Sequence, residues 1–214
     1  MKTPLTRASL MNHFAYNWWK YLLVLAAAFF IFGPKPYGLL YSRASRVPAE
    51  KEITFYVYGQ MNEQGMNEYM ENVRSTQMDN MESMIASALV PDDSYGPIQL
   101  TTYAAAGEGN VYLLPRDTYL TFASSGLCAA LEEDEELMAI LDGVDLQRGW
   151  KKNDAGENHI CGIPQDKLPG LSQYAYADNG FLCVLVTNKN PENTMKFFRI
   201  FCRDMLTAPV QIQE

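Results

Sequence analysis

The chain begins with one long apolar run and continues as short apolar segments separated by polar ones. The run covers residues 21–32, twelve apolar residues without interruption. As a helix these residues span about 18 Å, less than the ~30 Å hydrocarbon core of a bilayer. Trp18 and Trp19 precede the run, and Leu39 and Leu40 follow it. Aromatic residues are typical of the membrane interface, so with its flanks the run is long enough to cross.

The segment divides the chain into predicted regions. We expect a cytoplasmic tail over residues 1–15, a transmembrane signal anchor over 16–41, a linker over 42–52, an extracytoplasmic α/β domain over 53–207 and a C-terminal tail over 208–214. Lys2, Arg7 and Lys20 precede the run without an acidic residue, which favours a cytoplasmic N-terminus in a cell membrane. Two alternatives are a cleaved signal peptide, whose cleavage sites would lie far beyond the run, and a buried core helix.

Beyond the linker, apolar spacing predicts alternating strands and helices. β-branched and aromatic runs predict strands, and apolar residues at helical spacing predict helices. The predicted elements are a strand over 53–58, a helix over 62–89, a strand over 98–103, a strand over 111–114, a helix from Pro115 to about Gly126, a strand over 181–187 and a helix over 192–206. Residues 142–157 are expected to form a loop. Alternation of this kind predicts an α/β fold class with a mostly parallel sheet.

Charge excludes one class of partner. The chain has a net charge of −8, and residues 51–214 hold 11 basic and 24 acidic residues. Nucleic-acid binding requires a basic face, so no nucleic-acid partner is expected. The acidic run 132–136 admits a divalent cation, but the favoured interpretation is a solvated first turn of a helix.

The sequence carries no recognisable catalytic or metal-binding motif. Cys128, Cys161, Cys183 and Cys202 form no C-x-x-C pair, and no histidine stands at metal-ligand spacing, so neither a metal nor a cofactor is expected. Buried free thiols and disulfides both remain open for these cysteines. There is no nucleophile elbow and no phosphate loop, and the protein is not expected to be an enzyme.

Three motifs, in this order, resemble bacterial extracellular solute-binding proteins of ABC importers. They are Gly-Glu-Gly-Asn-Val-Tyr-Leu-Leu-Pro at 107–115, Cys-Gly-Ile-Pro at 161–164, and the strand, Asn-Lys-Asn-Pro-Glu turn and Phe-rich helix over 181–206. The resemblance implies a periplasmic-binding-protein-like fold of type II. Two features depart from it: Asn110 stands where the family usually has Asp, and only about 30 residues separate Trp150 from Phe181. The expected fold is therefore a single α/β domain resembling one lobe.

The resemblance implies a solute-binding-like module accessory to a transporter. Its expected partners are a transporter permease or another membrane protein, together with a small-molecule ligand. The alternative is a protein–protein interaction component of a membrane complex that has lost ligand binding. A ligand would lie at loops that follow the carboxyl ends of strands. The candidate ligand-binding residues are Gly59, Gln60, Tyr103, Tyr112, Arg116 and Trp150.

Overall fold

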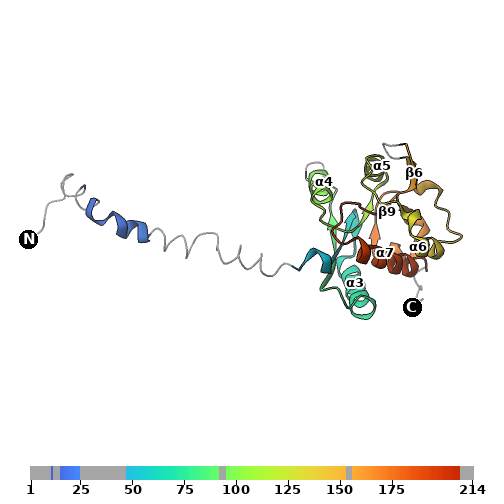
Figure 1. The fold of residues 1–214 in the computed structure, drawn as a ribbon, viewed down its shortest axis with the longest axis horizontal. Helices are drawn as coiled ribbons and strands as arrows, with labels where there is room; N and C mark the ends of the chain where they lie inside the picture. The colour runs from blue at the N-terminus through green and yellow to red at the C-terminus, as the bar shows by residue number, and fades with distance from the viewer. Residues whose placement is uncertain (1–10, 12–14, 25–46, 92–94, 153–155, 208–214) are drawn as a thin grey trace, which may run out of the picture. The chain divides into compact units, whose positions relative to one another are not determined.

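The computed structural model describes residues 11, 15–24, 47–91, 95–152 and 156–207, and the chain divides into two compact units, Met1–Arg46 and Val47–Glu214 (Figure 1). In the first unit residues 15–24 are helical, and the side chains of Trp18 and Trp19 are exposed. No helix within the described residues is both long and apolar enough to span a membrane. Residues 25–41 of the predicted anchor and the predicted tail over 208–214 lie outside the described residues.

The second unit is a mixed α/β domain built on a five-stranded sheet of order β3-β1-β4-β9-β7. Its strands are β1 (Glu52–Tyr58), β3 (Ser83–Leu89), β4 (Val111–Leu114), β7 (Ile163–Pro164) and β9 (Phe181–Val184). β1 pairs in parallel with β3 and β4, whereas β9 runs antiparallel to both β4 and β7. Four strands therefore point one way and β9 alone is reversed, which confirms the predicted mostly parallel sheet.

Helices cover both faces of this sheet. In Figure 1, α4 and α5 lie on one side of the strands, and α3 and α7 lie on the other. The helices are α3 (Glu63–Gln77), α4 (Gly96–Ala106), α5 (Arg116–Ser124), α6 (Glu135–Ile140) and α7 (Pro191–Met205). Short 3-10 turns are η1 (Ala49–Lys51), η2 (Leu131–Glu133), η3 (Gln147–Gly149), η4 (Gln165–Lys167) and η5 (Pro169–Gln173). Two small ribbons complete the domain: β2 (Gln60–Met61) with β8 (Ala175–Tyr176), and β5 (Trp150–Lys152) with β6 (Asn158–Ile160).

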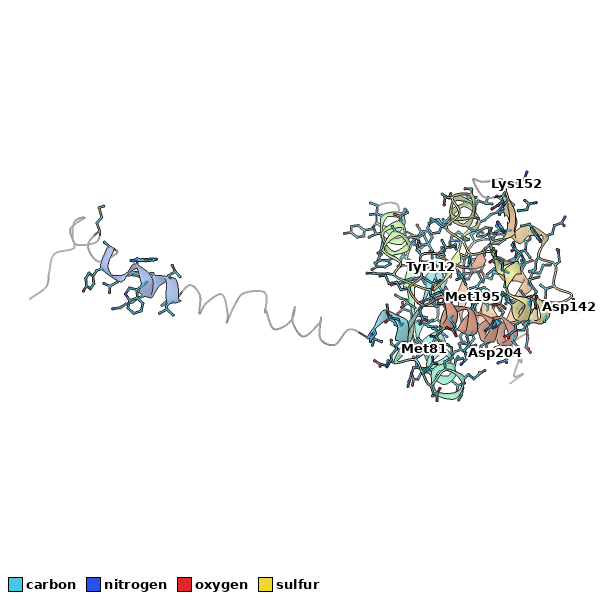
Figure 2. The ribbon with its side chains drawn as sticks, in the orientation of Figure 1. Met81, Tyr112, Asp142, Lys152, Met195 and Asp204 are labelled. Carbon is cyan, nitrogen blue, oxygen red and sulfur yellow. The ribbon has the colours of Figure 1, made fainter. Side chains whose placement is uncertain are left out.

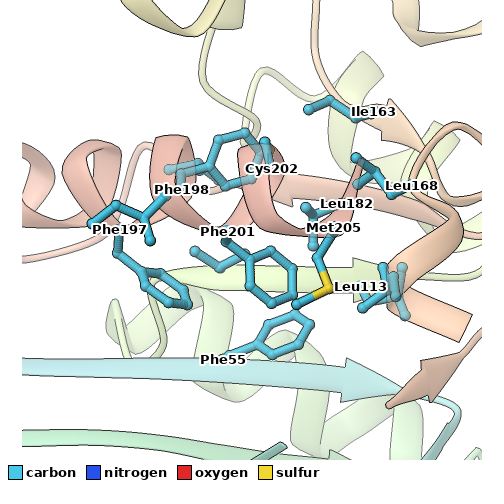
Figure 3. Packing of buried hydrophobic residues seen from close by; sticks show 14 of the residues in the cluster. Phe55, Leu113, Ile163, Leu168, Leu182, Phe197, Phe198, Phe201, Cys202 and Met205 are labelled. Atoms are coloured by element: carbon cyan, nitrogen blue, oxygen red, sulfur yellow. The ribbon is translucent and has the colours of Figure 1, made fainter. Parts of the chain in front are cut away.

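Alternation along the strands divides the core between the two faces of the sheet. Phe55 and its neighbours two residues away join the cluster beneath α3 and α7, whereas Tyr58 joins the cluster beneath α4 and α5. Phe201 of α7 packs on Phe55 with ring centroids 5.3 Å apart (Figure 3). The middle strands bury side chains on both faces, as the uninterrupted apolar run at 111–114 predicts.

The predicted helix over 62–89 is wrong in its second half. Helix α3 begins after Asn62, whose side chain accepts a hydrogen bond from Gly65 N, and ends at Gln77. After a turn at 79–80 the chain forms β3, which pairs with β1 along its whole length. Met78, Met81 and Met84 continue the methionine spacing of α3 beyond its end. Met84 is nevertheless buried as part of a strand, where it alternates with exposed Ile85. Pairing with a distant strand thus overrides the local pattern.

The predicted strand over 98–103 is also wrong, because these residues lie in helix α4. Pro97 stands in the first turn, where its missing N–H costs nothing. Gly107 ends the helix with a φ of 63°, a left-handed conformation that favours glycine. Leu100 and Ala104, four residues apart, are buried on one face of the helix.

The other predicted elements form close to their expected bounds. The predicted strands over 53–58 and 111–114 and both predicted helices that follow residues 115 and 191 are confirmed. The predicted strand over 181–187 is confirmed through Val184. The predicted loop over 142–157 instead includes η3 and β5, and β6 begins directly after it. The compact unit begins at Val47, within the segment predicted as a linker, where Lys51 forms an ion pair of 2.6 Å with Glu82.

Candidate functional site

The carboxyl ends of β1, β4 and β7 meet at one edge of the sheet, where a ligand site is expected. Residues 174–180 of the same chain cross this edge. Tyr174 O accepts a hydrogen bond of 2.7 Å from Asn62 N, and Asp178 O accepts one of 3.2 Å from Arg116 N. The side chain of Gln165 also holds this segment, donating to Ala175 O at 2.8 Å. The edge is therefore partly covered by its own backbone.

A cavity of about 420 Å³ remains beside this crossing segment, at the start of α5. We call it the basic cavity, and its lining residues are Arg116, Leu120, Arg148, Lys151, Asn179 and Phe181. These residues come from α5, η3, β5, the turn before β9 and the first residue of β9. Segments that are distant in the sequence thus form one concave surface, in the size range of small-molecule sites.

The walls of the basic cavity are held by buried contacts. The ring of Tyr119 stacks on Phe181 with centroids 4.1 Å apart and an interplanar angle of 9°. Its hydroxyl donates a buried hydrogen bond of 2.8 Å to Gly149 O. Burial raises the pKa of Tyr119, so its phenol stays protonated as a donor. A Cβ at Gly149 would meet Gly162 O at 2.1 Å, so only glycine allows this approach of η3 to β7.

Two of the cations in the basic cavity have acidic neighbours. Arg148 forms an ion pair with Asp166, and both side chains are at least half exposed. Arg116 lies 3.7 Å from Asp117, whose side chain is 95% exposed. Exposed pairs of this kind are weak and open to exchange with another anion.

The structure brings only part of the predicted site together. Gly59 and Gln60 follow β1 at the carboxyl edge, but a Cβ at Gly59 would meet Tyr176 O at 2.3 Å, so backbone already occupies this position. Arg116 lines the basic cavity. Trp150 comes directly after η3 in the chain and is 43% exposed.

The other two predicted residues lie elsewhere. Tyr103 does not follow a strand, because it lies in α4 and stacks on Tyr56 with centroids 5.2 Å apart. Tyr112 is fully buried in the middle of the domain, and its hydroxyl donates to Glu108 O (Figure 2). Burial, with Tyr103 nearby, raises the pKa of Tyr56 to about 12. These tyrosines pack together near the start of β4.

Sequence reasoning missed Arg148, Lys151 and Asn179. A signal for the first two is the run Arg-Gly-Trp-Lys-Lys at 148–152, the densest basic segment of an acidic domain. A signal for Asn179 is the Asn-Gly pair before a strand, which favours a turn, and Asn179 has a φ of 46°.

A second cavity of about 580 Å³ lies near the end of α5, and we call it the acidic cavity. Its lining residues are Ala123, Gly126, Cys128, Ala129, Ala130, Glu133, Asp134, Glu157, His159, Cys161, Val186 and Met195. The carboxylate of Asp134 accepts a hydrogen bond of 2.8 Å from Leu137 N and binds Arg199 at 2.9 Å. Asp134 thus already serves the fold.

The acidic run 132–136 also has structural roles. Asp134 caps α6, so the run provides the first turn of a helix, as the favoured interpretation predicts. Glu132 binds His159 Nδ1 at 2.6 Å and accepts a hydrogen bond of 2.8 Å from Ile160 N. Among the described residues, no group of three or more His, Cys, Asp or Glu is placed to hold a metal ion.

All four cysteines are buried and free. Burial raises the pKa of Cys161 to about 11. A hydrogen bond with Cys183, followed by burial, raises the pKa of Cys128 well above its ordinary value. Burial likewise raises the pKa of Cys202. The structure therefore shows free thiols held in their neutral form.

Comparison with known proteins returns solved structures from the family that the sequence resembles. A family 1 extracellular solute-binding protein from Alicyclobacillus acidocaldarius subsp. acidocaldarius DSM 446 is similar over 56% of this chain and 29% of its own, with 15% identity and a TM-score of 0.41. An N-glycan transport solute-binding protein from Streptococcus pneumoniae is similar over 53% of this chain and 24% of its own, with 18% identity and a TM-score of 0.37. A family 1 protein from Bifidobacterium longum subsp. infantis is similar over 54% of this chain and 27% of its own, with 19% identity and a TM-score of 0.37. The chain thus spans less than a third of these structures. No family model matches the chain, and no curated protein matches it in sequence.

Proposed function

We propose that the chain is a membrane-anchored extracytoplasmic module that binds a small solute and acts as an accessory to a transporter. The observation that carries this proposal is the basic cavity at the carboxyl edge of the sheet. Ligands of open α/β sheets bind outside the carboxyl ends of the strands. Arg116, expected there from the sequence, lines this cavity together with residues from three other segments.

The resemblance in the sequence supports the same proposal. Its three motifs fall on elements that meet in the sheet: residues 107–115 lead into β4, residues 161–164 include β7, and residues 181–206 supply β9 and α7. β9 lies between β4 and β7 and pairs with both. Motifs far apart in the sequence are thus adjacent in the fold.

Membrane anchoring through residues 16–41 remains part of the proposal. Within its described portion, Trp18, Trp19, Leu22, Leu23 and Val24 are all more than half exposed. Exposed aromatic and aliphatic side chains on one helix favour an apolar environment. The expected topology is a single pass with a cytoplasmic N-terminus and a transporter permease as the neighbouring partner.

We infer binding and not catalysis for this module. The cysteines that line the acidic cavity are protonated at neutral pH, because burial and a neighbouring thiol raise the pKa of each. His159, the histidine in the described residues, is engaged by Glu132 at 2.6 Å. These groups serve packing and local pairing.

The proposed function is tested by thermal denaturation of the full chain with a panel of sugars, amino acids and short peptides. A solute that binds the native state raises the Tm in a concentration-dependent way. Leu120→Trp should fill the basic cavity and abolish the shift. Ile98→Trp, at a position of α4 that is 62% exposed, should leave the shift intact. Equal shifts in both variants, or no shift with any solute, would contradict the proposal.

A second candidate function is an interaction component that has lost ligand binding. The observation that favours it is the crossing segment 174–180, which covers the carboxyl edge around Gly59. In this case no solute shifts the Tm, while the full chain co-purifies with a permease through residues 16–41. Deleting those residues should then abolish co-purification.

A further inference from the structure

The basic cavity concentrates positive charge in a domain that is otherwise acidic. Residues 51–214 contain 11 basic and 24 acidic residues. Three of those 11, Arg116, Arg148 and Lys151, line the basic cavity, and its described lining includes no acidic residue. Cations placed together repel one another, so an arrangement of this kind is most favourable when an anion lies between them.

The three cations come from separate segments whose positions are fixed. Arg116 is the first residue of α5, Arg148 lies in η3 and Lys151 lies in β5. The hydrogen bond from Tyr119 to Gly149 O joins α5 to η3, and Cys161 N donates to the same carbonyl at 3.0 Å. The cations are therefore presented by a rigid frame, which reduces the entropy that a ligand loses on binding.

The remaining walls indicate what accompanies the anionic group. Leu120 and Phe181 supply an apolar surface. Asn179 supplies an amide whose nitrogen donates a hydrogen bond of 3.3 Å to the exposed Asp178 carboxylate and whose oxygen can accept one. The volume of about 420 Å³ suits a small solute and excludes a folded partner. The start of α5 adds the positive end of a helix dipole beside Arg116.

The acidic neighbours leave the cavity available. Asp166 pairs with Arg148 from outside the lining, and the two side chains are 60% and 50% exposed. A carboxylate or phosphate entering the cavity would compete with Asp166 for Arg148, and guanidinium groups bind such oxyanions in a bidentate manner.

We propose that the basic cavity binds the oxyanion group, a carboxylate or a phosphate, of a small solute through Arg116, Arg148 and Lys151. This inference rests on the proposed function and specifies the chemical class of its ligand. It predicts binding that weakens as salt is added, because mobile ions screen exposed charges.

The experiment measures binding to the full chain by titration calorimetry with two anionic probes, inorganic phosphate and citrate, and one neutral probe, maltose. Phosphate and citrate differ in their oxyanion group, so their relative affinities show whether the cavity prefers a phosphate or a carboxylate. Lys151→Gln and Arg148→Gln should each weaken anion binding by about tenfold, the loss expected for one charge-assisted contact. Asp166→Ala should strengthen it several-fold by removing the competing carboxylate.

Arg203→Gln provides the matched control, because it removes the same charge from an exposed position on α7, outside the cavity lining. The inference predicts affinity within about twofold of the unmodified chain in this variant. Equal losses in Arg203→Gln and Lys151→Gln would overturn it, since the effect would then reflect net charge.

Two further outcomes separate this inference from the proposed function. Binding of maltose that Leu120→Trp abolishes, with no binding of either anion, would overturn the anionic class and leave the solute-binding function intact. No binding of any probe, together with no Tm shift across the solute panel, would overturn both.

Discussion

The two cavities beside α5 contain charged groups that are used in opposite ways. In the acidic cavity, Asp134 caps α6 and binds Arg199, and its side chain is only 14% exposed. In the basic cavity, Arg148 makes a single ion pair with Asp166 from outside the lining, and both side chains are at least half exposed. Polar groups that are buried must be satisfied by the fold, whereas exposed ones remain available to a ligand. The comparison separates charged groups that stabilise the fold at one end of α5 from the proposed binding groups at the other.

The largest effect should appear in the reactivity of the acidic-cavity thiols. The pKa of Cys161 is raised to about 11, so at pH 8 it is a thiolate about a hundredfold less often than an ordinary cysteine. Iodoacetamide labelling of the native chain should therefore be at least about 100-fold slower than labelling in urea, as measured by mass spectrometry. A native rate within tenfold of the unfolded rate would show that this cavity opens to solvent.

The next largest effect is a difference in stability between two variants, each of which removes an acidic residue at one of the cavities. Asp134→Ala removes a helix cap and a partly buried ion pair. The free energy of unfolding, measured by urea titration, should therefore fall by about 2 kcal/mol. Asp166→Ala removes an exposed pair and should change stability by less than about 0.5 kcal/mol. The comparison fails if the two variants lose equal stability.

The sequence predicts the central strands and the helices after residues 115 and 191 because their signals are local. Residues 111–114 are continuously apolar, and the structure buries this strand on both faces. The prediction failed for residues 83–89, because the methionine spacing of α3 continues into β3 and the deciding contact is with β1. The prediction also failed for α4. Its β-branched and aromatic residues favour a strand, but Pro97 in the first turn and Gly107 at the end mark a helix.

The candidate site was predicted less completely than the fold. Arg116 was among the predicted residues because it lies close in sequence to the end of a recognisable strand, and strand ends are known locations of ligands. Arg148 and Lys151 reach the same cavity through tertiary contacts, among them the hydrogen bond from Tyr119 of α5 to Gly149 of η3, which joins residues 30 positions apart. A tertiary hydrogen bond of this kind leaves no periodic signal, whereas the basic run that carries these residues was visible.

A smaller effect should follow from removing that hydrogen bond. Tyr119→Phe keeps the ring stacked on Phe181 but leaves the buried Gly149 carbonyl with one partner fewer. Stability should fall by about 1 kcal/mol, and oxyanion affinity should fall a few-fold as η3 loosens. Tyr176→Phe is the control, because Tyr176 is 56% exposed in β8. Tyr119→Phe with unchanged stability and affinity would show that this bond does not position the cavity.

The smallest predicted effect is a pH dependence at the His159–Glu132 pair beside the acidic cavity. The hydrogen bond from His159 to Glu132 raises the pKa of the imidazole above its ordinary value near 6.5. Because the pKa of His159 is higher in the folded state than in the unfolded state, its protonated form stabilises the fold. This stabilisation is complete below the unfolded-state pKa and is lost as the pH rises through the folded-state pKa.

The Tm difference between the unmodified chain and Glu132→Gln should therefore be larger at pH 6 than at pH 8.5. Glutamine can still accept the hydrogen bond from Ile160 N, while an uncharged amide replaces the carboxylate oxygen beside His159 Nδ1. In a His159→Gln background the same substitution should give a difference that does not vary with pH. A Tm difference that stays constant with pH in both backgrounds would show that the His159–Glu132 pair contributes no titrating charge. Of the two pairs compared at the acidic cavity, only Asp134–Arg199 would then stabilise it.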